Sequence, residues 1–373
     1  MKKYSLTFLV AFLVLVLSSC SAFKAPSVET GTITEFEKYG HAKLDITIEK
    51  MFNDGYELGD TVNLYFSNGY EFKDVPFFNG YYVKKGEVML RAYPTHKEIA
   101  ACINYGKIYE VANLKVGDTV IITLAKKGGA LDTQILNSLS YSNNRNDFSS
   151  NEVFANFREI TTKGVGKGKL YRSASPINNE NNRASTADTL MHLAGIKSVI
   201  NLADSYDEIA SYIAKDDFNS PYYQSLYTMG NVIALNMPVD FSSESFQEDL
   251  TAGIKKLVTD NMHTPILIHC TEGKDRAGFT SALLEALMGA SYDEIVSDYM
   301  MSYKNYYGIT KENDPKRYDV IVRNNIDEML KVIADVSDVK DITTQKLING
   351  AKMYLIGGGM GTAEVDSLIS LLK

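Results

Sequence analysis

Strict alternation of apolar and polar side chains marks the first part of the chain. Residues 44–48 read Leu-Asp-Ile-Thr-Ile, and residues 62–66 read Val-Asn-Leu-Tyr-Phe. A period of two places every second side chain on one face of an extended strand, which is typical of half-buried strands. The tetrapeptide Gly-Asp-Thr-Val occurs at residues 59–62 and 117–120, each time as a predicted turn leading into a strand. These features predict a small antiparallel barrel or sandwich over residues 21–145.

A different pattern follows, in which short apolar runs alternate with longer segments of helical character. The apolar run at residues 265–268 predicts a buried strand, and residues 196–202, in which Ile196, Val199, Ile200 and Leu202 are apolar, are expected to form another. The predicted helices are residues 186–194, 242–258, 277–288, 292–307 and 318–336. A polar stretch at residues 141–150 separates the two patterns. It predicts a boundary near residue 145 and a second domain over residues 146–373.

Several aromatic residues lie close together in the first domain. They are Tyr70, Phe72, Phe77, Phe78, Tyr81 and Tyr82. Packing of the core and of hairpins is the favoured interpretation, particularly because the chain has no tryptophan. The alternative is a face on which a ligand such as a glycan stacks.

The N-terminus has the features of a secretory signal. Lys2 and Lys3 precede an apolar run over residues 6–17, which is short for a membrane-spanning helix, and the run ends in Leu-Ser-Ser-Cys. This ending resembles the cleavage box of bacterial lipoproteins. The resemblance implies that residues 1–20 form the signal and that Cys20 carries a diacylglycerol group, which would hold the protein to the outer face of a membrane in the cell envelope. The alternative is a secreted protein cleaved near Ser21 and Ala22.

Composition excludes several classes of function. The chain is 45% apolar and 23% charged with a net charge of −8, which argues against a nucleic-acid partner. Its three cysteines, Cys20, Cys102 and Cys270, provide no disulfide framework if Cys20 is lipidated and Cys270 must be free. The histidines have no metal-ligand spacing, so we expect no metal and no other cofactor.

The spacing between Cys270 and Arg276 is the strongest chemical signal in the chain. These residues lie between a predicted buried strand and a predicted helix, in the loop that leads to the helix N-terminus. Unpaired backbone N–H groups and the positive end of the helix dipole favour a phosphate dianion and the thiolate form of the cysteine. The guanidinium of Arg276 can grip two phosphate oxygens. Gly273 allows the loop to curl around the oxyanion.

Residues 269–278, His-Cys-Thr-Glu-Gly-Lys-Asp-Arg-Ala-Gly, resemble the signature of the cysteine-dependent protein tyrosine phosphatases. The Gly-Lys-Asp-Arg variant is similar to that of bacterial tyrosine and dual-specificity phosphatases that overlap with phosphoinositide phosphatases. Residues 154–159, Phe-Ala-Asn-Phe-Arg-Glu, and 168–173, Gly-Lys-Leu-Tyr-Arg-Ser, extend the resemblance. Where the family reads Asp-Leu-Arg, residues 201–203 read Asn-Leu-Ala, so Ala203 replaces an expected basic group.

The resemblance implies an α/β domain with a central, mostly parallel sheet flanked by helices. It also implies a phosphomonoester hydrolase that forms a phosphocysteine intermediate on Cys270, with phosphorylated proteins, inositol phosphates or phosphoinositides as substrates. The substrate-binding residues that it implies are His269, Thr271, Glu272, Gly273, Lys274, Ala277 and Gly278.

Two aspartates compete for the role of general acid. Asp240 lies about thirty residues before the nucleophile, where phosphatases of this family carry the acid, and Asp275 lies inside the loop itself. A simpler interpretation of Asp240 is the N-cap of the helix over residues 242–258, for which Ser243 is an equal candidate.

The remaining loop residues leave alternatives open. Lys274 either holds additional phosphate groups of the substrate or is a solvated side chain, and Glu272 opposes the first of these. His269 is expected to orient the loop through hydrogen bonds to backbone carbonyls. Ala277 stands where the family has Ser or Thr, which predicts slow hydrolysis of the phosphocysteine. An alternative function is therefore a phosphate-binding module with weak or lost turnover.

Overall fold

The computed structural model describes residues 26–373, so Cys20 and the predicted signal lie outside the described residues. The chain divides into two compact units, one ending at Leu139 and the other spanning Ser140–Lys373. None of the helices described in this range is long and apolar enough to cross a membrane.

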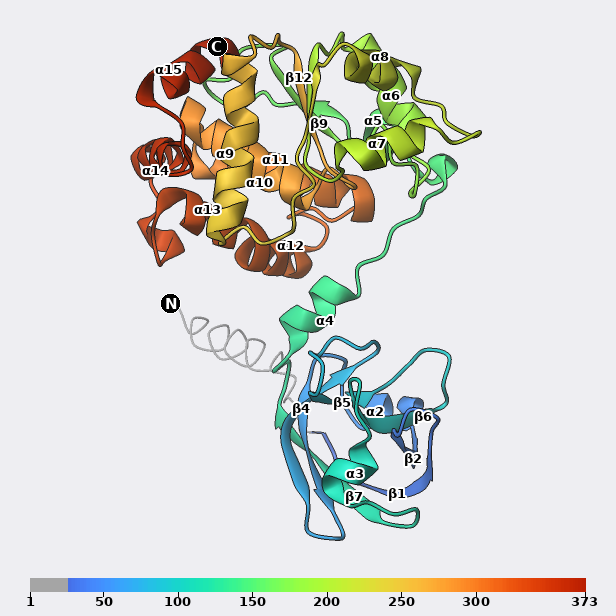
Figure 1. Cartoon of the computed structure of the whole chain (residues 1–373). Helices are drawn as coiled ribbons and strands as arrows, with labels where there is room; N and C mark the ends of the chain where they lie inside the picture. The colour runs from blue at the N-terminus through green and yellow to red at the C-terminus, as the bar shows by residue number, and fades with distance from the viewer. Residues whose placement is uncertain (1–25) are drawn as a thin grey trace, which may run out of the picture. The chain divides into compact units, whose positions relative to one another are not determined.

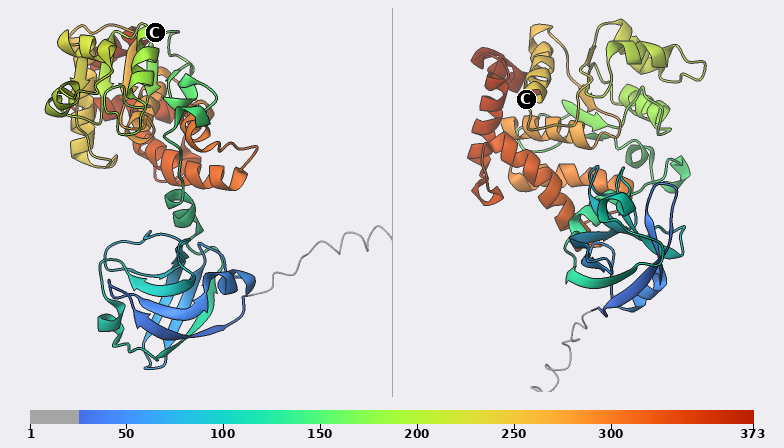
Figure 2. Two further views of the ribbon diagram at one scale, coloured as in Figure 1. Left: turned by 90° about the vertical axis from the view of Figure 1, so that its right-hand side faces the viewer. Right: turned by 60° about the horizontal axis from the view of Figure 1, so that its bottom comes forward.

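The first unit is a closed barrel of strands in the order β1-β2-β6-β5-β4-β3-β7 (Figures 1 and 2). All neighbouring strands are antiparallel except β4 and β5, which run parallel. The strands are β1 (Glu29–Phe36), β2 (Ala42–Thr47), β3 (Thr61–Phe66), β4 (Glu71–Phe78), β5 (Val88–Arg91), β6 (Glu98–Ile103) and β7 (Thr119–Lys126). Three short helices accompany them: α2 (Ile48–Asn53), α3 (Ile108–Ala112) and α4 (Leu131–Asn137).

Alternation in the sequence becomes alternation of burial in this barrel. In β2, every second side chain from Ala42 is buried in the core. Both Gly-Asp-Thr-Val turns have the same structure: Asp60 accepts a hydrogen bond from the Glu57 amide, and Asp118 accepts one from the Lys115 amide, each at 2.8 Å. The turns lead into β3 and β7, which pair with each other. Of the two predicted architectures, an antiparallel barrel or a sandwich, the structure has the barrel, and it differs from the prediction in the parallel pair of β4 and β5.

The second unit is an α/β fold built on a five-stranded sheet in the order β11-β10-β12-β9-β8. The four strands from β11 to β9 are parallel, and β8 is antiparallel to β9 at the edge. The strands are β8 (Arg158–Glu159), β9 (Leu170–Ser173), β10 (Ser198–Asn201), β11 (Val232–Ala234) and β12 (Ile266–His269). Buried Val, Ile and Leu side chains fill β10 and β12, because helices cover both faces of a parallel sheet.

Helices lie on both sides of this sheet (Figure 1). One group comprises α5 (Asn151–Phe154), α6 (Ala184–Leu193), α7 (Tyr206–Ile213) and α8 (Pro221–Thr228). The other comprises α9 (Glu244–Thr259), α10 (Asp275–Met288), α11 (Tyr292–Tyr307), α12 (Pro315–Ile321), α13 (Asp327–Ala334), α14 (Thr344–Gly357) and α15 (Thr362–Leu372). A π-helical turn (Val322–Ile326) joins α12 to α13, and short 3-10 turns occupy Arg145–Asp147 and Val339–Asp341. Within the second group, α10 contacts α11, α13, α14 and α15, which explains why almost every side chain of α10 is buried.

Candidate active site

Cys270 lies where the sequence predicts it, directly after a central strand and before a helix. Strand β12 ends at His269 between its neighbours β9 and β10, and α10 begins at Asp275. The Cys270 side chain is buried and only 3% exposed. The carboxyl ends of parallel strands are where open α/β sheets place their binding sites. We call residues 270–275 the cysteine loop.

The backbone of the cysteine loop is held from outside by its carbonyl oxygens. Every carbonyl from residue 271 to residue 274 accepts a hydrogen bond from another element. The backbone N–H of Ser175 donates to Thr271 (3.1 Å), and the Tyr306 hydroxyl donates to Glu272 (2.7 Å). The side-chain amide of Asn156 donates to Glu272 (3.1 Å) and Gly273 (3.2 Å). The guanidinium of Arg172 donates to Gly273 (2.9 Å) and Lys274 (3.1 Å).

These contacts determine the direction of the loop amides. In a planar trans peptide the N–H group points opposite to the C=O group. Because the carbonyls face the scaffold, the N–H groups of residues 272–275 face away from it. In the described part of the chain these amides have no protein acceptor. Successive free amides at a helix N-terminus form a concavity that binds anions.

Gly273 permits this backbone path, as the sequence predicts. Its φ is +67°, and a Cβ atom there would lie 2.1 Å from the Ser173 carbonyl oxygen. A side chain would therefore displace either the loop or the end of β9.

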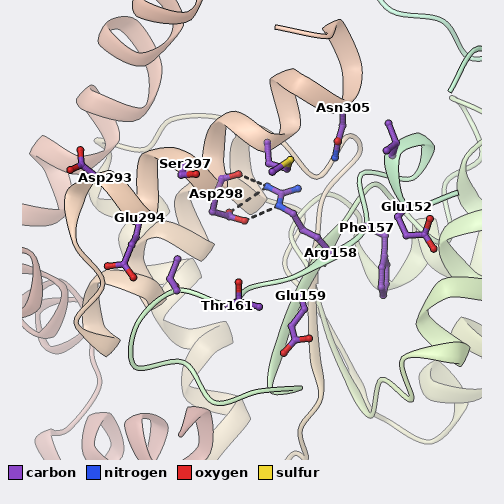
Figure 3. A pocket seen from close by; sticks show the side chains of 13 residues that line it. Glu152, Phe157, Arg158, Glu159, Thr161, Asp293, Glu294, Ser297, Asp298 and Asn305 are labelled. Carbon is purple, nitrogen blue, oxygen red and sulfur yellow. Dashed lines mark hydrogen bonds and ion pairs between the residues drawn. The ribbon is translucent and has the colours of Figure 1, made fainter. Parts of the chain in front are cut away.

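A buried ion-pair cluster supports the donors. Figure 3 shows Arg158 directed at Asp298, with Nε to Oδ1 at 2.7 Å, and Arg172 Nη1 lies 2.6 Å from Oδ2 of the same carboxylate. Burial acts to raise the pKa of Asp298, but the two guanidinium groups outweigh it and lower the pKa to about 2. Arg158 also donates to the Asn156 side-chain oxygen at 2.8 Å. The cluster thus fixes both Asn156 and Arg172, which hold the loop.

The cavity beside this cluster is separate from the cysteine loop. It measures about 600 Å³, and its lining includes Arg158, Asp298 and Asn305 but none of residues 269–278. We assign it no part in binding the phosphate.

Arg276 is positioned by the loops that follow β10 and β11. Its Nη1 donates to the carbonyls of Met237 (3.0 Å) and Leu202 (3.5 Å), and its Nη2 donates to the Thr271 hydroxyl at 3.2 Å. Asp240 lies three residues beyond Met237, so the segment that carries this candidate acid contacts Arg276, the predicted phosphate-binding residue.

The structure removes one interpretation of Asp240. The N-cap of α9 is Ser243, whose hydroxyl accepts a hydrogen bond from the Phe246 amide. Asp240 is exposed, and its carboxylate accepts from the Ser242 hydroxyl at 3.2 Å. A capping role for Asp240 is therefore wrong, while its catalytic role stays a prediction.

Asp275 is partly enclosed, with its side chain 38% exposed. It is the first residue of α10, and burial raises its pKa, although Lys274 acts in the opposite direction. A carboxyl group with a raised pKa retains its proton closer to neutral pH, as a general acid requires.

Lys274 is not a solvated side chain. Its ammonium lies 2.9 Å from Glu272, 3.8 Å from Asp275 and 3.3 Å from the Tyr307 hydroxyl, and the rings of Tyr303 and Tyr307 lie 5.6 Å away. Burial opposes its charge, yet the acidic neighbours raise the pKa of Lys274. Its charge is thus balanced within the protein. The Tyr141 hydroxyl also donates to Glu272.

His269 is buried beneath the loop, and its ring packs edge-on against Tyr223 with centroids 5.8 Å apart. Burial lowers the pKa of His269 to about 3, so the ring is neutral, while an interaction with the Cys270 backbone acts in the opposite direction. Neither ring nitrogen reaches a described partner with regular hydrogen-bond geometry. The role of His269 in orienting the loop stays a prediction.

Ala277 and Gly278 lie within α10 and are buried. A Cβ atom at Gly278 would lie 2.7 Å from the Tyr299 ring. The close packing of α10 against α11 therefore explains why this position is a glycine. The described residues contain no group of three or more His, Cys, Asp or Glu side chains placed to hold a metal ion.

Comparisons with known proteins agree with this geometry. The sequence model of the tyrosine phosphatase family matches residues 151–372. The chain belongs to this family. Residues 26–139, the barrel, lie outside the matched region.

Individual relatives match this tyrosine phosphatase family member over short stretches or at low similarity. "Putative tyrosine-protein phosphatase" of Cupriavidus necator is 49% identical over 37 residues, which cover 10% of this chain and 14% of the relative. TpbA of P. aeruginosa in complex with pTyr is 17% identical with a TM-score of 0.25, covering 44% of this chain and 84% of that one. The core catalytic domain of the PP-IP phosphatase SIW14 from S. cerevisiae is 20% identical with a TM-score of 0.26, covering 48% and 91%.

Sequence reasoning missed the residues that hold the loop. Asn156, Arg158 and Arg172 lie in segments that resemble the family, yet the sequence analysis gives them no role. A signal was available, because Arg172 is a charged residue inside a short apolar strand, and a buried charge requires a partner. Nothing in the sequence around Asp298 indicates that it is this partner.

Proposed function

We propose that the protein is a phosphomonoester hydrolase that acts through a phosphocysteine intermediate. The observation that carries the proposal is the cysteine loop, in which the carbonyls of residues 271–274 accept hydrogen bonds from other elements, so that the amides of residues 272–275 face the opposite way, next to Cys270 and Arg276 in the chain. The amides and the guanidinium would hold the equatorial phosphate oxygens and stabilise their charge in the transition state.

The reaction takes two steps. The Cys270 thiolate attacks phosphorus, the bond to the leaving oxygen breaks, and Asp240 or Asp275 gives that oxygen a proton. The same carboxylate then takes a proton from water as the water attacks phosphorus. The S–P bond breaks, and inorganic phosphate and the thiolate result.

The test uses the two described cysteines as a matched pair. Cys270→Ser should abolish hydrolysis of p-nitrophenyl phosphate, while Cys102→Ser, a change in the buried core of the barrel, should leave hydrolysis intact. The proposal fails if wild type has no turnover or if Cys270→Ser retains it. Retention of a phosphorylated ligand without turnover would instead support the phosphate-binding module, which Ala277 favours.

We further propose phosphotyrosine in proteins as the preferred substrate over inositol phosphates and phosphoinositides. Lys274, the additional cation of the loop, is balanced by Glu272 and Asp275. These carboxylates would disfavour a ligand with several phosphate groups. Initial rates on a panel of phosphotyrosine peptides and inositol polyphosphates test this preference, and faster turnover of inositol polyphosphates would contradict it.

We also propose that Cys20 anchors the protein to the outer face of a bacterial membrane. The support is the apolar run that ends in Leu-Ser-Ser-Cys. Cys20→Ser should prevent lipid labelling and release the protein from the membrane fraction; unchanged labelling would contradict the anchor.

A further inference from the structure

The barrel contains an open cavity of about 600 Å³ that the phosphatase chemistry does not use. It is formed by the turn between β1 and β2, the loop after β4 and the turn between β6 and α3. Its lining includes Lys38, Tyr39, His41, Tyr81, Tyr105 and Lys107. A volume of this size suits a small-molecule ligand.

The tyrosines of this cavity are not explained by packing. Phe77 and Phe78, predicted to pack in the core, are buried as expected, whereas Tyr39 and Tyr105 are 67% and 87% exposed. Tyr105 also has a φ of +54°, a left-handed conformation that is strained for a bulky side chain. Glycine would be more stable at that position if the turn had only a structural role. Exposure and strain together indicate that the Tyr105 ring has a role other than stabilising the fold.

Polar residues joined by hydrogen bonds lie at and beneath the cavity. The Tyr81 hydroxyl lies 3.2 Å from Nδ1 of His41, which in turn lies 3.2 Å from Arg91. Arg91 is held by Glu37 through two hydrogen bonds of 2.7 and 2.8 Å. The charges of Glu37 and Arg91 are therefore balanced beneath the cavity, and the floor presents hydroxyl and imidazole groups.

Of the two lysines that line the cavity, Lys38 has no ion pair among the described residues. Lys38 lies 5.3 Å from the Tyr39 ring, and Lys85 lies 5.8 Å from the Tyr105 ring. Lys107 also lines the cavity, although it is paired with Glu110 at 2.9 Å. No carboxylate among the described residues lines the cavity.

We propose that this cavity binds an acidic saccharide, whose sugar rings stack on Tyr39 and Tyr105 and whose acid group pairs with Lys38. A tyrosine ring offers an apolar face and a hydroxyl edge, which match the apolar face and the hydroxyl groups of a sugar ring. A nucleic acid also stacks on aromatic rings beside cations. The net charge of −8 would repel such a long polyanion, whereas Lys38 suffices for a short acidic ligand.

Calorimetric titration of the full-length protein tests the proposal with three probes: a trigalacturonic acid, its methyl ester and a single-stranded oligonucleotide. The trisaccharide acid should bind, and the uncharged ester should bind about tenfold more weakly. The oligonucleotide should not displace the bound trisaccharide acid. The proposal is overturned if the acid does not bind at millimolar concentration, if acid and ester bind equally, or if the oligonucleotide binds more tightly.

Variants separate binding from folding. Tyr105→Gly should weaken binding of the trisaccharide acid about tenfold while the melting temperature stays equal or rises, because the backbone strain is relieved. Tyr39→Ala provides a second test of stacking. Tyr65→Ala, a 37% exposed tyrosine on β3 away from the cavity, is the matched control and should bind as wild type does. Unchanged binding by both Tyr105→Gly and Tyr39→Ala would overturn the proposal.

Discussion

Glu272 and Lys274 form an ion pair at the edge of the predicted phosphate site, and the pair decides how much positive charge reaches a substrate. Glu272→Gln would release Lys274 from its nearest anion. We expect the ratio of initial rates on inositol polyphosphate and phosphotyrosine peptide to rise by about tenfold, which corresponds to roughly 1.4 kcal/mol of altered interaction. In the double variant Glu272→Gln/Lys274→Gln the ratio should fall back, and a ratio that stays high would exclude Lys274 as the cause.

The two candidate acids predict opposite results for the variants Asp275→Asn and Asp240→Asn. Burial raises the pKa of Asp275, so a proton that Asp275 supplies is present below this raised pKa and is lost as the pH rises through it. If Asp275 is the acid, Asp275→Asn should lower kcat by roughly 10²–10⁴-fold and remove the alkaline limb of the kcat profile, with little change in Asp240→Asn. If Asp240 is the acid, the two variants should exchange these results. Full activity of both variants would exclude a general acid at either position.

Ala277 lacks the hydroxyl that would stabilise the departing thiolate. We expect the phosphocysteine of wild type to persist longer than that of Ala277→Thr, measured by acid quenching and mass spectrometry of the Cys270 peptide. Ala277 is fully buried, so Ala277→Ser, the smaller change, controls for disturbance of α10. Equal lifetimes in all three proteins would rule out the effect.

At the scale of the element, the cysteine loop depends on contacts with β9, α11 and the segment before β8. Gly273→Ala tests the closest of them, because its Cβ would lie 2.1 Å from the Ser173 carbonyl oxygen. Gly195→Ala is a matched control, since Gly195 has nearly the same φ, +66°, and no atom lies within 4 Å of its Cβ position. Both variants incur the left-handed strain of about 1 kcal/mol.

Only Gly273→Ala should also displace the loop. We expect a loss of kcat/KM of at least about a hundredfold for Gly273→Ala and a change of less than about twofold for Gly195→Ala. Thermal unfolding of both variants establishes that they fold. Similar kinetics in the two variants would mean that the close approach at Gly273 is not needed for activity.

Elements with a local signal could be predicted from the sequence. The alternation in β2 and β3, the apolar run of β12 and the cysteine spacing each depend on neighbours in the chain, and the structure has them as expected. The partners of the loop could not be predicted in this way. Asn156 and Asp298 are separated by well over a hundred residues, and only the fold brings them together with Arg158. The pairing of Lys274 and the burial of His269 likewise depend on the packing of the whole unit.

At the scale of the whole molecule, the catalytic unit begins before its first regular helix. Arg183 is 2% exposed and donates to the Ser142 carbonyl at 2.8 Å and the Asn143 side chain at 2.6 Å, while Tyr141 reaches Glu272. The rings of Tyr141, Phe148, Phe154 and Tyr306 surround its guanidinium at 4.6–5.4 Å. The polar residues 141–148 are therefore part of the packing of this unit.

This packing sets where the chain can be shortened. A fragment that starts at Ser140 keeps the cover over Arg183 and the Tyr141 contact, whereas one that starts at Ser150 leaves a buried guanidinium without two of its acceptors. We expect the shorter fragment to melt at a lower temperature and to be cleaved faster by trypsin at Arg183. Equal protease resistance of the two fragments would mean that this segment is dispensable, and the first residue of the minimal phosphatase would then lie beyond Phe148.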